Sequence, residues 1–96
     1  FILYSMEPLN FDSLKEKLET GFDWPRVYLF KFIVPSDNKK IAEVENLFNS
    51  KEAQISLRAS KTGKYVSVSA KEMMMSPDKV IERYKEASTI EGIMSL

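Results

Sequence analysis

The stretch RVYLFKFIVP, residues 26–35, constrains the fold more than any other part of the chain. Its β-branched and aromatic residues, closed by a proline, predict a β-strand. Successive side chains of a strand point to opposite sides, and Lys31 interrupts the apolar run. Burial of Lys31 without a partner would cost several kcal/mol. We therefore expect Lys31 to face water and the alternate residues to face the core: Tyr28, Phe30, Phe32 and Val34.

Two further segments, AQISLRAS (residues 53–60) and KYVSVSAK (residues 64–71), alternate between apolar and polar residues. This pattern is typical of strands with one buried side, and the intervening Lys61-Thr62-Gly63 predicts a hairpin turn. The outward residues of the second segment include Tyr65, Ser67 and Ser69, whereas Val66, Val68 and Ala70 are expected in the core.

The Gly63-Lys64 pair also invites comparison with a phosphate-binding loop. That motif needs a glycine five residues earlier and a serine or threonine directly after the lysine. The chain has Arg58 and Tyr65 at these two positions, and the pair lies between two strands instead of a strand and a helix. We interpret the segment as a hairpin.

Three segments have helical character. Residues 12–21 combine a Ser13–Glu16 pair, typical of a capping box, with Gly21, which suits a left-handed residue at a helix end. Ser36 or Asp37 begins a second helix with apolar residues at Ile41, Val44, Leu47 and Phe48. Ser76-Pro77-Asp78 begins a third, whose buried stripe is Val80, Ile81, Tyr84 and Ala87.

The segment TIEGIMSL is expected to close the chain as an edge strand. After the first helix, the order is then strand, helix, strand, strand, helix, strand. This order predicts an α+β, ferredoxin-like βαββαβ fold: a four-stranded antiparallel sheet with two helices on one face, plus a short N-terminal helix. We expect a single domain over residues 12–96. Residues 1–11 are expected to be an N-terminal extension, with Met6 a candidate natural start.

Composition argues against most catalytic chemistry. The chain has no histidine and no cysteine, so the commonest general base, thiolate nucleophiles and the commonest zinc ligands are missing. We therefore predict no enzyme, no catalytic residues, no metal and no cofactor. The opening apolar run is too short for a membrane span or signal peptide, so we expect a cytoplasmic protein with no membrane partner.

The predicted open face of the sheet is the candidate interaction surface. It combines apolar and basic residues, and it comprises Leu29, Lys31, Ile33, Arg58, Tyr65, Ser67 and Ser69, together with Gln54, Ser56 and Ile93. Antiparallel sheets commonly have one face packed on the core and the other face exposed to solvent. An apolar centre rimmed by cations also suits a partner protein, a second copy in a homodimer, or the first helix folded across it.

RNA binding is a rival hypothesis, because the RNA-recognition motif shares the βαββαβ order and stacks bases on exposed rings. The phase of residues 26–35 removes the rings of that strand from the open face, which leaves Tyr65 as its aromatic residue. Fourteen basic and fourteen acidic residues give no net charge, although a local basic patch is compatible with this balance. The sequence therefore disfavours a nucleic-acid partner.

Three consecutive methionines, Met73 to Met75, precede the third helix. Flexible thioethers often fill gaps in a core, and a methionine-rich contact surface is the alternative. Consecutive strand residues point opposite ways, which argues against joint copper chelation.

The run SKTGKYVSVS resembles the third strand of the YbeD-like family of small bacterial proteins, a domain of unknown function. The resembling motif consists of Ser60, Gly63, Tyr65, Ser67 and Val68, and the likeness extends to WPRVYLFKFIVPSDN and SPDKVIERYKEASTIEGIMSL. The resemblance implies a ferredoxin-like fold similar to ACT regulatory domains, which bind amino acids and assemble through strands or helices. It implies no catalytic residue. The turn VPSDN lacks the glycine typical of ACT ligand sites.

These observations predict a non-enzymatic regulatory or protein-interaction module that binds an unknown protein partner or self-associates. The alternatives are an ACT-like sensor of a small molecule such as an amino acid, and an RNA-binding domain.

Overall fold

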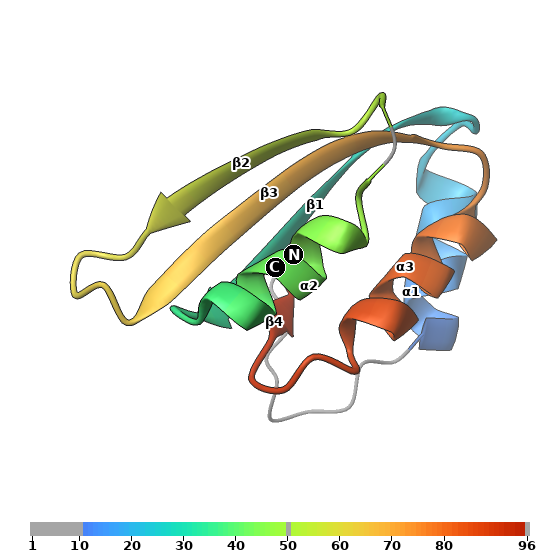
Figure 1. The fold of residues 1–96 in the computed structure, drawn as a ribbon. Coiled ribbons are helices and arrows are strands. Elements are labelled where there is room, and N and C mark those ends of the chain that lie inside the picture. Colours follow the sequence, from blue (N-terminus) through green and yellow to red (C-terminus); the bar gives the residue numbers. More distant parts are fainter. Residues whose placement is uncertain (1–10, 50, 96) are drawn as a thin grey trace.

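The computed structural model of the chain describes residues 11–49 and 51–95 (Figure 1). Its elements in chain order are α1 (Phe11–Gly21), β1 (Arg26–Pro35), α2 (Asn38–Asn46), β2 (Gln54–Ala59), β3 (Tyr65–Met74), α3 (Pro77–Ala87) and β4 (Met94–Ser95). The four strands form one antiparallel sheet in the order β2-β3-β1-β4. The three helices gather on one side of this sheet (Figure 1). This α+β arrangement is compatible with a ferredoxin-like fold.

Local sequence signals set where two of the helices begin. Asp37 caps α2, and its side chain accepts a hydrogen bond of 2.9 Å from the Lys39 amide. Ser76 caps α3 in the same way, with Pro77 in the first turn. Both caps satisfy amide groups that have no partner within the helix. The sequence predicted Ser76 for α3 and left Ser36 and Asp37 as alternatives for α2, of which the structure has Asp37.

The aromatic side chains of β1 form the centre of the core. Phe30 and Phe32 are fully buried, whereas Lys31 between them is exposed, so the predicted strand phase is confirmed. The ring of Phe30 lies 5.1 Å from the ring of Phe48 and 5.4 Å from that of Tyr84, between ring centroids. These contacts connect β1 to the end of α2 and to α3 in one aromatic cluster.

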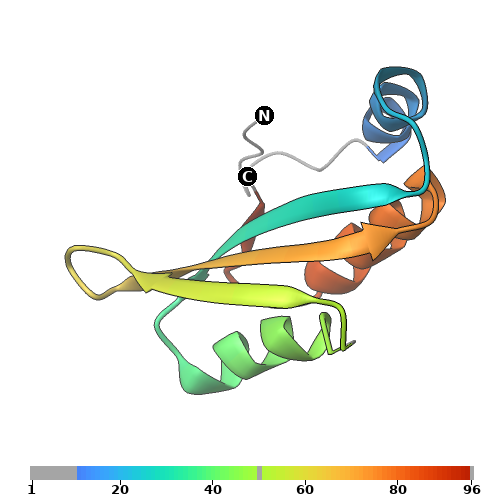
Figure 2. The ribbon, with the colours of Figure 1, turned by 90° about the horizontal axis from the view of Figure 1, so that it is seen from above.

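The β2–β3 hairpin is also confirmed. Gly63 has a φ of +73°, which glycine adopts without strain, and its amide donates to the Ser60 carbonyl at 3.0 Å. Ser60 also holds the turn through its side chain, because its Oγ accepts from the Tyr65 amide at 3.2 Å. The hairpin projects beyond the helices in both views (Figures 1 and 2). Leu57 points toward the helix side of the sheet, but it is 48% exposed because the hairpin extends beyond the helices.

Helix α1 departs from the prediction in three respects. It begins at Phe11, so Ser13 lies inside the first turn and is not the capping residue. Gly21 ends the helix without a positive φ, so the left-handed ending is wrong. The helix packs on α3 with Leu14 and Leu18 buried, and it does not cross the open face. An exposed ion pair of 2.9 Å between Lys15 and Asp78 accompanies this packing.

The C-terminal segment is less extended than predicted. Of its described residues, which end at 95, Met94 and Ser95 pair with β1, opposite Ile33 and Phe32. The preceding Gly92 has a φ of +82° and lies against Pro35, where a Cβ atom would come within 3.0 Å of the proline ring. The close approach to Pro35 and the positive φ together explain a turn at this point instead of a longer strand.

Two further statements concern the ends of the chain and membranes. The predicted extension over residues 1–11 falls outside the described residues, apart from Phe11, which begins α1. Within residues 11–49 and 51–95, no helix has the length and apolar character needed to span a bilayer.

The core phase can be tested by two neighbouring substitutions. Phe32→Ala should lower the free energy of unfolding by about 3–5 kcal/mol, because it leaves a cavity among packed rings. Lys31→Leu, one residue away on the solvent-exposed side of β1, should change the free energy of unfolding by less than about 0.5 kcal/mol. Urea denaturation of both variants measures the difference. Small and similar effects of the two substitutions would mean that the opposite side of β1 faces the core.

The Tyr84 hydroxyl supplies a test in alkaline solution. Burial raises its pKa above the ordinary value of 10.0, and Tyr28, whose hydroxyl lies 3.1 Å away, adds to the shift. The unfolded chain therefore loses this proton before the native state does, so stability is retained below pH 10 and declines above it. Between pH 9 and pH 11, the wild type should lose about 1 kcal/mol more unfolding free energy than Tyr84→Phe. The prediction is contradicted if the free energies of unfolding of the two proteins, measured in urea, fall by the same amount between pH 9 and pH 11.

Candidate functional site

The side of the sheet opposite the helices forms a continuous surface, which we call the outer face. Strand register brings its residues together in rows: Leu29 lies beside Lys71, Lys31 beside Ser69, and Ile33 beside Ser67. All seven predicted surface residues lie on it. The outer face comprises Val27, Leu29, Lys31, Ile33, Gln54, Ser56, Arg58, Tyr65, Ser67, Ser69, Lys71, Met73 and Met94.

Several apolar side chains of the outer face are exposed. Leu29 is 47% exposed and Tyr65 is 43% exposed. The prediction placed Ile93 on this face, but Ile93 packs against the core. Its neighbour Met94 pairs with Ile33 and therefore occupies the outer position. No helix of residues 11–49 and 51–95 covers the surface, because all three lie on the other side of the sheet (Figure 1).

Charge is strongly segregated on this surface. Lys31, Arg58 and Lys71 point outward from the three long strands, and no aspartate or glutamate of these strands does so. Lys61 in the hairpin turn lies beside them and brings the number of cations to four. None of the four has an ion-pair partner among the described residues. The rest of the sequence holds ten basic and fourteen acidic residues, so this surface is positive in a chain that has no net charge.

The hairpin end of the outer face is hollowed. This hairpin hollow has a volume of about 440 Å³, and its lining consists of Ile33, Arg58, Ala59, Ser60, Lys61, Tyr65, Ser67 and Met94. Arg58, Ser67, Ile33 and Met94 lie in one row across the four strands. The small Ser67 therefore sits between longer side chains, which creates the depression.

The five motif residues divide into two groups. Gly63 shapes the turn, and Val68 is fully buried in the core. These two positions are explained by folding alone. Ser60, Tyr65 and Ser67 line the hairpin hollow, and Ser60 also holds the turn through its side chain, so these three are the motif residues available for binding.

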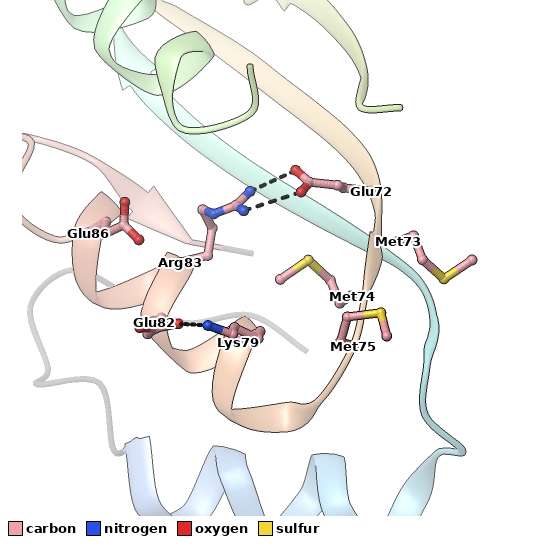
Figure 3. A pocket seen from close by; sticks show the side chains of 8 residues that line it. All are labelled: Glu72, Met73, Met74, Met75, Lys79, Glu82, Arg83 and Glu86. Carbon is pink, nitrogen blue, oxygen red and sulfur yellow. Dashed lines mark hydrogen bonds and ion pairs between the residues drawn. The ribbon is translucent and has the colours of Figure 1, made fainter. Parts of the chain in front are cut away.

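A second depression, the methionine hollow, lies between α3 and the end of β3 (Figure 3). It has a volume of about 280 Å³ and is lined by Glu72, Met73, Met74, Met75, Lys79, Glu82, Arg83 and Glu86. Arg83 binds the Glu72 carboxylate through two hydrogen bonds of 2.8 and 3.3 Å, and Lys79 pairs with Glu82 at 3.3 Å.

The charges of the methionine hollow are thus largely neutralised within the chain. The Arg83 guanidinium also lies 4.9 Å from the centre of the Phe48 ring, which fixes it over the core. We interpret this arrangement as structural. Sequence analysis missed the Glu72–Arg83 pair, although the alternation that buries Val68 and Ala70 places Glu72 on the same side.

The three methionines do not act together. Met74 is buried, whereas Met73 and Met75 are 45% and 64% exposed, and Figure 3 shows Met73 and Met74 directed away from one another. Met74 is therefore a core filler, and Met73 belongs to the outer face. Among the residues that the structure describes, no group of three histidine, cysteine, aspartate or glutamate side chains could hold a metal ion.

The Glu72–Arg83 pair generates a stability prediction. Arg83→Met keeps an apolar contact with the core but leaves a largely buried carboxylate without its partner. It should lower the free energy of unfolding by about 1–3 kcal/mol. The double variant Glu72→Gln/Arg83→Met should recover part of this loss, because it removes the unpaired charge. Strictly additive effects in urea denaturation would argue against coupling of the pair.

Comparison with known proteins gives one family. No curated protein and no solved structure matches the chain. Residues 19–96 match the family described as a protein of unknown function (DUF493), a span that includes the whole sheet and both hollows. The YbeD-like and ACT-like resemblances stay predictions. Because the match covers most of the sequence, the chain belongs to the DUF493 family of unknown function.

Proposed function

We propose that this protein is a non-enzymatic interaction module that docks an acidic protein surface on the outer face of its sheet. The observation that carries the proposal is the combination of four cations without an ion-pair partner among the described residues and exposed apolar side chains on one side of a chain with no net charge. The non-enzymatic part rests on the lack of histidine and cysteine. The proposed location is the cytoplasm, as expected from the sequence.

The mixture of side chains supports a protein partner. Protein interfaces combine an apolar centre with a polar rim, and complementary charge accelerates encounter and rejects wrong partners. Leu29, Ile33 and Tyr65 provide apolar area, and Lys31, Arg58 and Lys71 lie among and beside them. An acidic partner would bury the first group and neutralise the second.

A second copy docked through the same face is less favourable. A twofold interface places the same surface on both subunits, so the cations of one copy would meet those of the other. Like charges at an interface oppose association. The homodimer expected from the sequence therefore ranks below an acidic heterologous partner.

Two other functions are alternatives. RNA could use the four cations, but among the described residues the outer face offers Tyr65 as its one stacking ring, because the rings of Phe30 and Phe32 are buried. An amino-acid sensor of the ACT type could use the hairpin hollow, whose volume of about 440 Å³ lies in the range of ligand pockets. We favour the protein partner because it uses both the charge and the apolar residues.

The proposal is tested by matched charge reversals. Lys31→Glu/Lys71→Glu alters the outer face, and Lys39→Glu/Lys51→Glu gives the same change in net charge at exposed positions outside that face. Proteins captured from an extract of the source cells would be identified by mass spectrometry, purified and titrated against the three forms. We expect the face variant to bind the purified partner at least tenfold more weakly and the control variant to bind within threefold of wild type.

Three results would contradict the proposal. Equal losses in both variants would indicate a nonspecific charge effect. Capture abolished by nuclease would indicate RNA. A concentration-dependent dimer, seen by sedimentation and lost only in the face variant, would identify a second copy as the occupant.

A further inference from the structure

We infer that the hairpin hollow is an anchor site for one aromatic side chain of the partner. Acidic residues that flank this aromatic residue in the partner would bind the cations of the hollow. The inference rests on the proposed function, and it specifies where on the outer face the partner is recognised and by which chemistry. The hollow is formed by Ser67 between Arg58 and Ile33, with Met94 beyond Ile33 and Tyr65 next along β3.

The lining of the hollow favours an aromatic group. Ile33, Met94 and the Tyr65 ring provide apolar contacts. A thioether and an aromatic ring both make favourable contacts with another ring beyond simple burial. Interface residues that contribute most to affinity are typically large side chains in pockets that become dry on binding.

The charge of the lining determines the neighbours of that aromatic group. Arg58 and Lys61 contribute two cations to the hollow, neither has an ion-pair partner among the described residues, and no acidic residue lines it. The guanidinium of Arg58 suits a carboxylate through two parallel hydrogen bonds. Aspartate or glutamate next to the aromatic residue would therefore complement the rim.

The exposure of the lining favours a peptide over a free small molecule. Tyr65 is 43% exposed, and Arg58, Ser60 and Lys61 are exposed as well. Small-molecule sites bury most of their ligand, whereas this hollow leaves one side of any small ligand in water. A partner protein closes that side with its own surface, which extends over the remainder of the outer face.

The experiment selects phage-displayed random decapeptides on the wild-type protein and measures the enriched peptides by fluorescence polarisation. Ser67→Leu fills the hollow. Ser36→Leu is the matched control, because it adds the same side chain at an exposed position that lies outside the outer face and does not line the hollow. Thermal unfolding of both variants establishes that each is folded before binding is measured.

We expect enriched peptides to carry an aromatic residue among acidic ones. Ser67→Leu should weaken their binding at least tenfold, Ser36→Leu less than threefold, and replacement of the peptide's aromatic residue by alanine at least tenfold. The inference is overturned if no peptide is enriched, if the enriched peptides lack this pattern, or if both leucine variants bind equally. A purified partner that is sensitive to Lys31→Glu/Lys71→Glu but insensitive to Ser67→Leu would reject the anchor site and leave the proposed function standing.

Discussion

Burial of Phe30 and Phe32 beneath the helices is the interaction on which the rest of the structure depends. These rings contact Phe48, just after α2, and Tyr84 on α3, so one strand connects both helices that cover the sheet. The aromatic contacts lie at the centre of the hydrophobic cluster, where loss of packed atoms is most costly. Because strand side chains alternate, placing these rings inside also places Leu29, Lys31 and Ile33 on the opposite side.

The outer face therefore has properties that a calculation of net charge does not reveal. Equal numbers of acidic and basic residues would suggest a protein without electrostatic preference. Folding separates them, because the outward positions of β1, β2 and β3 contain cations and no anions. Exposed charges of one sign act together on an approaching partner within the screening distance of about 8–10 Å at physiological salt. The orientation in which a partner approaches the outer face, and the rate of their encounter, would depend on this separation of positive from negative charge.

The two hollows illustrate how charge distinguishes a structural site from a binding site. In the methionine hollow, Arg83 and Glu72 satisfy one another within the chain, which holds α3 onto β3. In the hairpin hollow, Arg58 and Lys61 have no such partner among the described residues. A cation that contributes nothing to internal pairing is available to a ligand, and neighbouring apolar side chains add affinity once water is excluded.

The sequence by itself determined the features that depend on neighbours along the chain. Strand alternation sets which side of β1 faces the core, with Lys31 in water. Unpaired helix amides explain the caps, at Ser76 and at one of the two candidates Ser36 and Asp37. The backbone freedom of glycine explains the turn at Gly63. The tertiary structure alone decided the rest: the docking of α1 on α3, the placement of Met94 instead of Ile93 on the outer face, and the depression at Ser67. Each of these depends on the register or packing of segments far apart in the sequence, and short-range periodicity contains no information about which distant residues become neighbours.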